Sequence, residues 1–192
     1  KDRMCGRPFY YFAYGAAVSE VIIDLLTGES RLVRADLLHD VGKSLNPAID
    51  RGQIEGGFIQ GLGWLTTEEL VWNEDGRLTT HAPSTYKIPA CADRPLDWRV
   101  GFYAEGENSE ETIHKSKAVG EPPLMLAISA WLALSDALSG INGDKIDGAT
   151  YPGLDAPATP ERILLCANRL GARFVDAQAT SHRHAIQLEL NL

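Results

Sequence analysis

The sequence predicts an α+β fold in which mixed or antiparallel strands pack with a buried apolar helix and a glycine-rich helix. Short stretches alternate apolar and polar residues, as half-buried strands do. One longer stretch, 122–138, is apolar on nearly every helical face. These signals follow one another in irregular order, unlike the regular alternation of a doubly wound sheet. The length of 192 residues suits one domain of ordinary size.

Alternation and turn residues place the strands. Residues 16–26 and 31–41 predict two strands that pair through a turn at Gly28. Residues 68–80 predict a hairpin because Asp-Gly at its centre is a strong turn signal. Residues 96–102 alternate cleanly and predict a further strand, so four or five strands are expected in all.

Two helices are predicted in the first three quarters of the chain. Residues 52–67 repeat apolar side chains at helical spacing, with Gly56, Gly57, Gly61 and Gly63 among them. Because each glycine costs a helix about 1 kcal/mol relative to alanine, a helix that keeps several needs close backbone approach by another element or a ligand. The second helix starts at Pro122-Pro123 and runs to Gly140, and its apolar surface predicts burial.

The C-terminal region predicts one more helix and a tail. Thr159 followed by proline is an N-cap pattern, and the helix is expected to end before Gly171. Residues 1–175 are expected to form one unit, and the polar residues 176–192 show no period and predict disorder. The chain begins at Lys1, which fits a trimmed end or a piece of a longer protein. The apolar helix needs more neighbours than this chain supplies, which favours the longer protein.

Charge and cysteine content exclude several classes. The net charge of −8 argues against nucleic acid and anionic membrane surfaces as partners. The apolar run from 124 to 134 is too short to span a bilayer. Cys5, Cys91 and Cys166 are scattered, which predicts neither a disulfide framework nor a zinc site and fits a reducing, cytoplasmic compartment. His182 and His184 lie in the polar tail, where solvation is expected, and no protein metal site is predicted.

Glu121 is the first candidate for chemistry. It lies between Gly120 and the double proline, at the start of an apolar helix. The ordinary interpretation is an acidic side chain in a first helical turn, where the helix dipole favours it. The functional interpretation is a rigidly held general base in a largely apolar setting. Gln53 opens the glycine-rich helix, and its amide suits the edge of a heterocyclic cofactor, although a surface glutamine is the simpler interpretation.

Several ordered motifs resemble the molybdenum cofactor-binding part of the xanthine dehydrogenase/aldehyde oxidase family. The resemblance covers residues 8–170 in order and with the family's spacing. It is carried by the motifs DVGKSLNPAID (40–50), GQIEGGFIQGLG (52–63), PSTYKIP (83–89), SKAVGEPPL (116–124) and LDAPATPE (154–161).

The resemblance implies a role for four residues. Glu121 falls on the catalytic glutamate, which takes a proton from a molybdenum-bound hydroxyl while hydride passes to a sulfido ligand. Gln53 falls on a glutamine that hydrogen-bonds the molybdopterin, and Val119 and Gly120 fall beside that cofactor. The metal is held by the dithiolene sulfurs of the pterin, so no protein ligand is expected. Hypoxanthine and xanthine are the implied substrates.

The resemblance covers only the C-terminal part of a larger molybdopterin-binding domain. The substrate-clamping residues, FAD and the 2Fe–2S centres are expected in other parts of the full enzyme, which are the implied partners. This chain alone is therefore expected to be inactive. The alternatives are a catalytically inert fragment or a non-catalytic assembly or cofactor-handling module, and an enzyme whose substrates are aldehydes. A hydrolase using Glu121 would need a second catalytic group, and none is evident.

Overall fold

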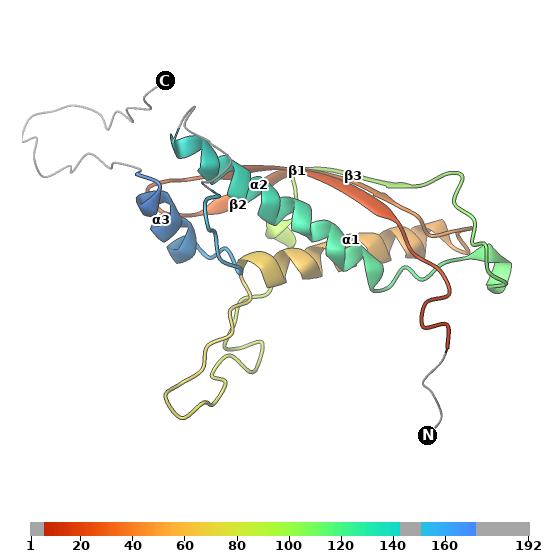
Figure 1. Ribbon diagram of the computed structural model, residues 1–192, viewed down its shortest axis with the longest axis horizontal. Coiled ribbons are helices and arrows are strands. Elements are labelled where there is room, and N and C mark those ends of the chain that lie inside the picture. Colours follow the sequence, from red (N-terminus) through yellow and green to blue (C-terminus); the bar gives the residue numbers. More distant parts are fainter. Residues whose placement is uncertain (1–5, 143–150, 172–192) are drawn as a thin grey trace, which may run out of the picture.

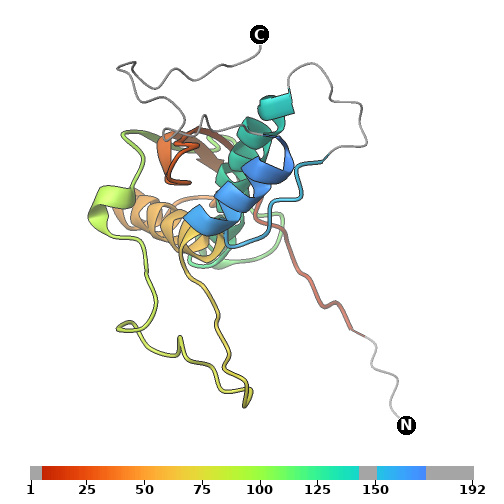
Figure 2. The same cartoon turned by 90° about the vertical axis from the view of Figure 1, so that its left-hand side faces the viewer.

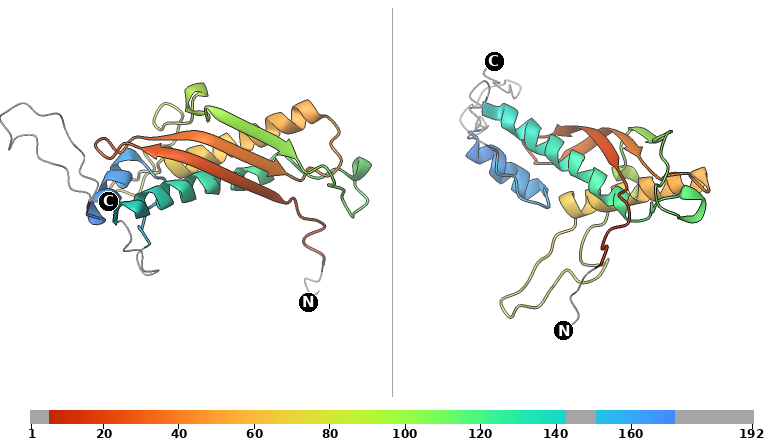
Figure 3. Two further views of the ribbon diagram at one scale, coloured as in Figure 1. Left: turned by 90° about the horizontal axis from the view of Figure 1, so that it is seen from above. Right: turned by 45° about the vertical axis from the view of Figure 1, so that its right-hand side comes forward.

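The protein folds as a mixed three-stranded sheet with helices on one face (Figure 1). The computed structural model describes residues 6–142 and 151–171. Strand β1 (Gly15–Ile23) pairs antiparallel with β2 (Ser30–His39), and β2 pairs parallel with β3 (Asp97–Phe102). The left panel of Figure 3 shows the three strands side by side over two helices. The α+β prediction is confirmed, but the described residues form three strands, not four or five.

The predicted hairpin over 68–80 is mostly a loop. Its turn is present, because the Asn73 side chain accepts hydrogen bonds from the backbone N–H groups of Asp75 and Arg77. Only one bridge, between Trp72 and Leu78, joins its two arms. The arms project from the body of the molecule (Figure 1), so no second layer buries them and they do not extend into strands.

Helix α1 (Pro47–Thr66) is the glycine-rich helix and starts five residues before its predicted position. Asn46 is its N-cap, with the side chain accepting from the N–H groups of Ala48 and Ile49. Pro47 occupies the first helical position, where its missing N–H costs nothing. The Asn-Pro pair is therefore the start of the helix.

The helix predicted from Pro122 to Gly140 has two parts. A 3₁₀ segment, η3 (Pro122–Ala127), leads into α2 (Ile128–Ser139). The prediction of burial all round is wrong: Ala130, Leu134 and Leu138 are buried, whereas Leu132 on the outer side is 51% exposed. By length and mean hydropathy the stretch Pro122–Ser139 would suffice to cross a membrane, a test that core helices also pass, and it is 39% buried against the rest of the fold.

Helix α3 (Pro160–Arg169) confirms the last helix prediction. Thr159 is the N-cap, and its hydroxyl accepts from the N–H of Arg162. In the end-on view of Figure 2, α3 lies beside α2. Short 3₁₀ turns complete the described structure: η1 (Cys91–Asp93), η2 (Ile113–Lys115) and η4 (Gly140–Asn142).

Two hydrophobic clusters stabilise the fold. The larger lies between the sheet, α1 and η3, where the Phe58 ring packs 6.3 Å from the Trp98 ring, centroid to centroid. The smaller joins the second half of α2 to α3. Free Cys166 is buried in it, and burial raises the pKa of its thiol. The tail 176–192, with His182 and His184, and Cys5 lie outside the described residues.

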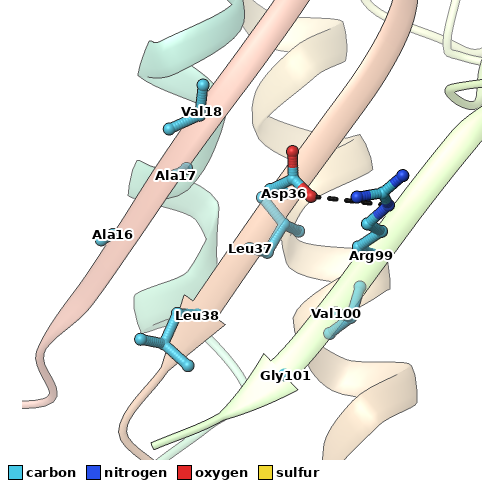
Figure 4. Close-up of a pocket in the computed structure, with 9 residues that line it drawn as sticks. All are labelled: Ala16, Ala17, Val18, Asp36, Leu37, Leu38, Arg99, Val100 and Gly101. Atoms are coloured by element: carbon cyan, nitrogen blue, oxygen red, sulfur yellow. Dashed lines mark ion pairs between the residues drawn. The ribbon is translucent and has the colours of Figure 1, made fainter.

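The second face of the sheet carries no helix in the described part of the chain. Figure 4 shows it as an open depression in which Ala16, Val18 and Leu38 lie beside the Asp36–Arg99 ion pair. Asp36 also pairs with Arg34, and this guanidinium lowers the pKa of the Asp36 carboxyl. The candidate site residues come from α1 and from the segment that leads into η3.

Candidate functional site

One face of α1 carries Gln53, Gly57 and Gly61. These residues are four positions apart, so they lie one above the other on the helix. Gly57 and Gly61 are buried, whereas Gln53 in the preceding turn is exposed. This stripe of one amide and two glycines is the surface on which the next element packs.

The 3₁₀ segment η3 packs directly against the two glycines. A Cβ built on Gly57 would lie 3.1 Å from the Cβ of Pro123, and one built on Gly61 would lie 2.8 Å from the Cβ of Ala127. No side chain fits at Gly61 without moving one of the two elements. The prediction that this helix keeps glycines for close approach of another element is confirmed at these two positions.

This packing brings together residues that are far apart in the sequence. Gly120 lies immediately before the η3 region, and a Cβ built on it would lie 3.6 Å from Oε1 of Gln53. Gln53 and Gly120 therefore form adjacent parts of one exposed surface. The glycine leaves the amide of Gln53 uncovered, which a larger side chain would not.

Val119 and Glu121 flank Gly120 in different environments. Val119 is half-buried and packs against the larger hydrophobic cluster. Glu121 is exposed and is the N-cap of η3, and its side chain makes no capping hydrogen bond. Within the described residues, no ion pair involves its carboxylate. The site thus combines an anchored backbone with a free carboxylate at its surface.

Comparisons with known proteins identify the family. A molybdopterin cofactor-binding domain model matches residues 1–95. Xanthine dehydrogenase/oxidase of Gallus gallus is 52% identical over 159 residues, which are 82% of this chain and 12% of that protein. Xanthine dehydrogenase of Oryza sativa subsp. japonica is 48% identical over 177 residues, 88% of this chain and 13% of that protein. The chain belongs to the molybdenum hydroxylase family.

A solved structure of the same family agrees with this fold. The aldehyde oxidoreductase from Desulfovibrio gigas superimposes with a TM-score of 0.64 and 26% identity, covering 84% of this chain and 16% of that chain. The present chain thus spans about 12–13% of the length of the xanthine dehydrogenases named above. It is a fragment of a larger molybdenum hydroxylase.

The chemistry of the site fits part of a molybdopterin pocket. A pterin ring carries hydrogen-bond donors and acceptors on its edge, and the exposed amide of Gln53 offers both kinds of group. Gly120 keeps the surface beside that amide low enough for a ring to approach. Among the described residues, no three His, Cys, Asp or Glu side chains gather as a metal cluster. Gln53, Val119 and Gly120 are the residues of this chain that would border the cofactor.

Sequence reasoning assigned no role to Asp40 and Lys117, which lie next to the candidate site. Their side chains are 8% and 7% exposed, and Lys117 Nζ lies 2.5 Å from Asp40 Oδ2. Each belongs to a motif that the family resemblance used, Asp40 opening the first and Lys117 preceding Glu121 by four positions. The presence of an acidic and a basic residue in two of these motifs was the one sequence feature that could have suggested an ion pair. Nothing in their spacing predicts that their side chains come into contact.

His39 is a further buried polar residue behind the site. It is 2% exposed, and within the described part of the chain neither ring nitrogen has a hydrogen-bond partner. Burial lowers the pKa of its imidazole, and the charge of Lys117 lowers it further against the opposing effect of Asp40. The imidazole is therefore held in its neutral form beside the ion pair.

The acidic loop over 104–112 lies at the surface, and its carboxylates are solvated or paired. Glu110 pairs with Arg7, and Glu111 pairs with Lys115 at 2.8 Å. Glu105 and Glu107 are exposed. Glu110 and Glu111 thus pair with nearby cations and not with residues of the candidate site.

Proposed function

We propose that this chain supplies the general base and one wall of the cofactor pocket of a molybdenum hydroxylase that oxidises hypoxanthine and xanthine to urate. One observation carries the proposal. Where η3 packs on the glycines of α1, Gln53 lies against Gly120, the residue that precedes Glu121. The similarity of most of this chain to xanthine dehydrogenases supports a purine substrate.

Glu121 acts as the base. Its backbone is fixed on one side by Val119 in the hydrophobic cluster and on the other by Pro123, which packs on α1. An oriented carboxylate takes up a proton at one of its oxygens as a bond forms to the substrate carbon. The molybdenum–pterin group, when bound, supplies the oxygen that is transferred and accepts the electron pair.

Gln53 orients the cofactor edge. Its amide donates through Nε2 and accepts through Oε1, so one side chain satisfies two neighbouring groups of a heterocycle. Gly120 permits the ring to approach the backbone next to the base. The groups that clamp the substrate, the remaining cofactor contacts, FAD and the iron–sulfur centres come from the rest of the enzyme, so the isolated chain is inactive.

The Glu121→Gln variant of the full-length enzyme tests the proposal. The amide keeps the size of the side chain but cannot take up the proton. General-base catalysis contributes about 10²–10⁴-fold, so kcat for xanthine should fall by about that factor. Molybdenum and pterin content should be unchanged, because Glu121 does not hold the cofactor in this proposal.

A matched control is Glu74→Gln, which changes an exposed glutamate on the projecting loop. It should leave kcat at the parental value. Turnover of the Glu121→Gln enzyme near that value would refute the role of the base.

Assays of the parental full-length enzyme distinguish purine from aldehyde substrates. Aldehydes are the alternative because the chain also resembles an aldehyde oxidoreductase. The ratio of kcat/KM for xanthine to that for an aromatic aldehyde is expected to favour xanthine. A ratio that favours the aldehyde would replace the purine assignment while leaving the role of Glu121 intact.

A further inference from the structure

The segment that leads into the candidate site is tied to the end of β2. Gly42 and Ser116 form an antiparallel bridge. The N–H of Lys117 donates to the carbonyl of Val41 at 2.8 Å, and the N–H of Lys43 donates to the carbonyl of Lys115 at 3.1 Å. These bonds form a short ladder whose strand continues into Val119, Gly120 and Glu121.

A buried ion pair crosses this ladder. Lys117 Nζ donates to Asp40 Oδ2 at 2.5 Å, and the other carboxylate oxygen accepts from the N–H of Gly42 at 2.8 Å. The N–H of Asp40 donates to the carbonyl of Tyr14, whose ring centroid lies 5.3 Å from Lys117 Nζ. One carboxylate therefore joins β2, the turn after it and the segment before the site.

Further contacts fix the same segment on its other sides. The carbonyl of Ser116 accepts from the side chains of Asn108 at 3.0 Å and Thr112 at 2.7 Å. The N–H of Ala118 donates to the Tyr11 hydroxyl at 3.1 Å. The chain is thus held up to Ala118, and packing of η3 on α1 holds it again from Pro123.

We propose that Asp40 and Lys117 are positioning residues for Glu121. They hold the incoming end of the segment that carries the base, as the glycine face of α1 holds its outgoing end. This inference rests on the proposed function of Glu121. It adds that the orientation of the base depends on a charged pair that touches neither substrate nor cofactor.

The physical reason lies in the directionality of a buried pair. A surface ion pair adopts many geometries and fixes little. A buried pair whose carboxylate also accepts from a backbone N–H is restricted to one geometry. Its two side chains are almost inaccessible to solvent, so water cannot replace the partner of either charge. Replacing both charges by neutral groups of similar size commonly preserves stability, so stability and orientation are separable by experiment.

The test uses the double variant Asp40→Asn/Lys117→Met in the full-length enzyme. The amide oxygen still accepts from Gly42, and the thioether fills the space of the lysine stem. We expect an unfolding temperature and a molybdenum and pterin content close to the parental values. Because displacement of a catalytic group by about 1 Å costs up to about 100-fold, we expect kcat for xanthine to fall about 10- to 100-fold with KM unchanged.

A double-mutant cycle shows whether the pair acts through the base. The same two changes are introduced into the Glu121→Gln enzyme, whose residual kcat no longer depends on the orientation of a carboxylate. We expect the pair variant to cause no further loss in that background. An equal loss in both backgrounds would overturn the inference, as would parental kcat in the double variant.

The control is a second ion pair distant from the site. Arg162 and Glu69 pair at 3.1 Å between α3 and the base of the projecting loop. Arg162→Met/Glu69→Gln should leave kcat unchanged. Parental turnover of the Glu121→Gln enzyme would refute the proposed function itself, whereas a loss there combined with an additive cycle would refute only the positioning role.

Discussion

His39 illustrates how burial of one side chain makes stability depend on pH. Its imidazole is almost fully buried, and burial lowers its pKa below the usual 6.5. Below about pH 6.5, His39 therefore binds a proton more readily in the unfolded chain than in the folded chain. The free energy of unfolding falls as pH decreases through this range, because the unfolded state carries more protons.

We therefore expect the stability difference between pH 7.5 and 5.5 to shrink in a His39→Leu variant. The contribution of one such group cannot exceed about 1.4 kcal/mol per pH unit. Urea unfolding at both pH values measures it. His81→Gln removes an exposed histidine and should leave the difference as in the parent. An unchanged pH dependence in His39→Leu would assign the effect to other groups.

Individual site residues were only partly predictable from the sequence. The local pattern around Glu121 fits an ordinary first-turn acid as well as a base, and Gln53 fits an ordinary surface amide. Their candidacy came from the family motifs. Contact between Gln53 and Gly120, and between Asp40 and Lys117, depends on packing of elements far apart in the chain. Periodicity describes one element at a time and carries no information on such contacts.

At the scale of the element, the glycines of α1 differ in whether another element packs against them. Gly61 lies against Leu124 and Ala127, whereas Gly56 on the other side of the helix has no heavy atom near a Cβ. The same substitution should therefore have opposite effects at the two positions. Gly61→Ala forces α1 and η3 apart, and overpacking of this kind costs about 1–3 kcal/mol. Gly56→Ala should stabilise the helix by about 0.5–1 kcal/mol.

Chemical denaturation of both variants measures this difference. The Gly61→Ala variant of the full-length enzyme should also lose molybdenum and pterin, since separation of the two elements moves Gln53 away from Gly120. Equal stability of the two variants would mean that η3 moves away from α1 without loss of stability. Packing of η3 on Gly61 would then not determine the position of Gly120.

Elements with strong local signals were predicted well. The three strands follow from alternation, and α3 follows from its Thr-Pro start and glycine end. The start of α1 was predicted five residues too late, because the apolar repeat begins after the N-cap Asn46 and Pro47, the pattern with which this helix begins. The prediction of a hairpin over 68–80 was wrong for another reason. Its turn is present, but no neighbouring layer packs against its two arms, and only one bridge joins them.

At the scale of the whole molecule, much apolar surface lies outside the two hydrophobic clusters. Val18 and Ile22 on β1 are 69% and 62% exposed, and Ile128 and Leu132 on α2 are 42% and 51% exposed. A groove lined partly by Val18 and Leu132 separates this edge strand from α2. The sequence predicted that α2 needs more neighbours, but not that its exposed side would lie beside an open strand edge.

We expect the isolated chain to self-associate through this surface, because exposed apolar patches and unpaired strand edges promote association. Val18→Lys/Leu132→Lys should shift it toward the monomer in light-scattering measurements. Ser84→Lys/Ser109→Lys adds the same charge at exposed polar positions and serves as the control. Equal effects of the two pairs would show that net charge, and not the apolar surface, governs association.

The double proline after Glu121 has a consequence for the hydrogen bonding of that side chain. A carboxylate at a helix start is normally captured by the free N–H groups of the next residues. Pro122 and Pro123 have no N–H, and the N–H of Leu124 already donates to the main-chain carbonyl of Glu121 at 3.1 Å. The first turn of η3 thus offers no N–H group to the carboxylate of Glu121. The lone pairs of that carboxylate stay available for an incoming proton.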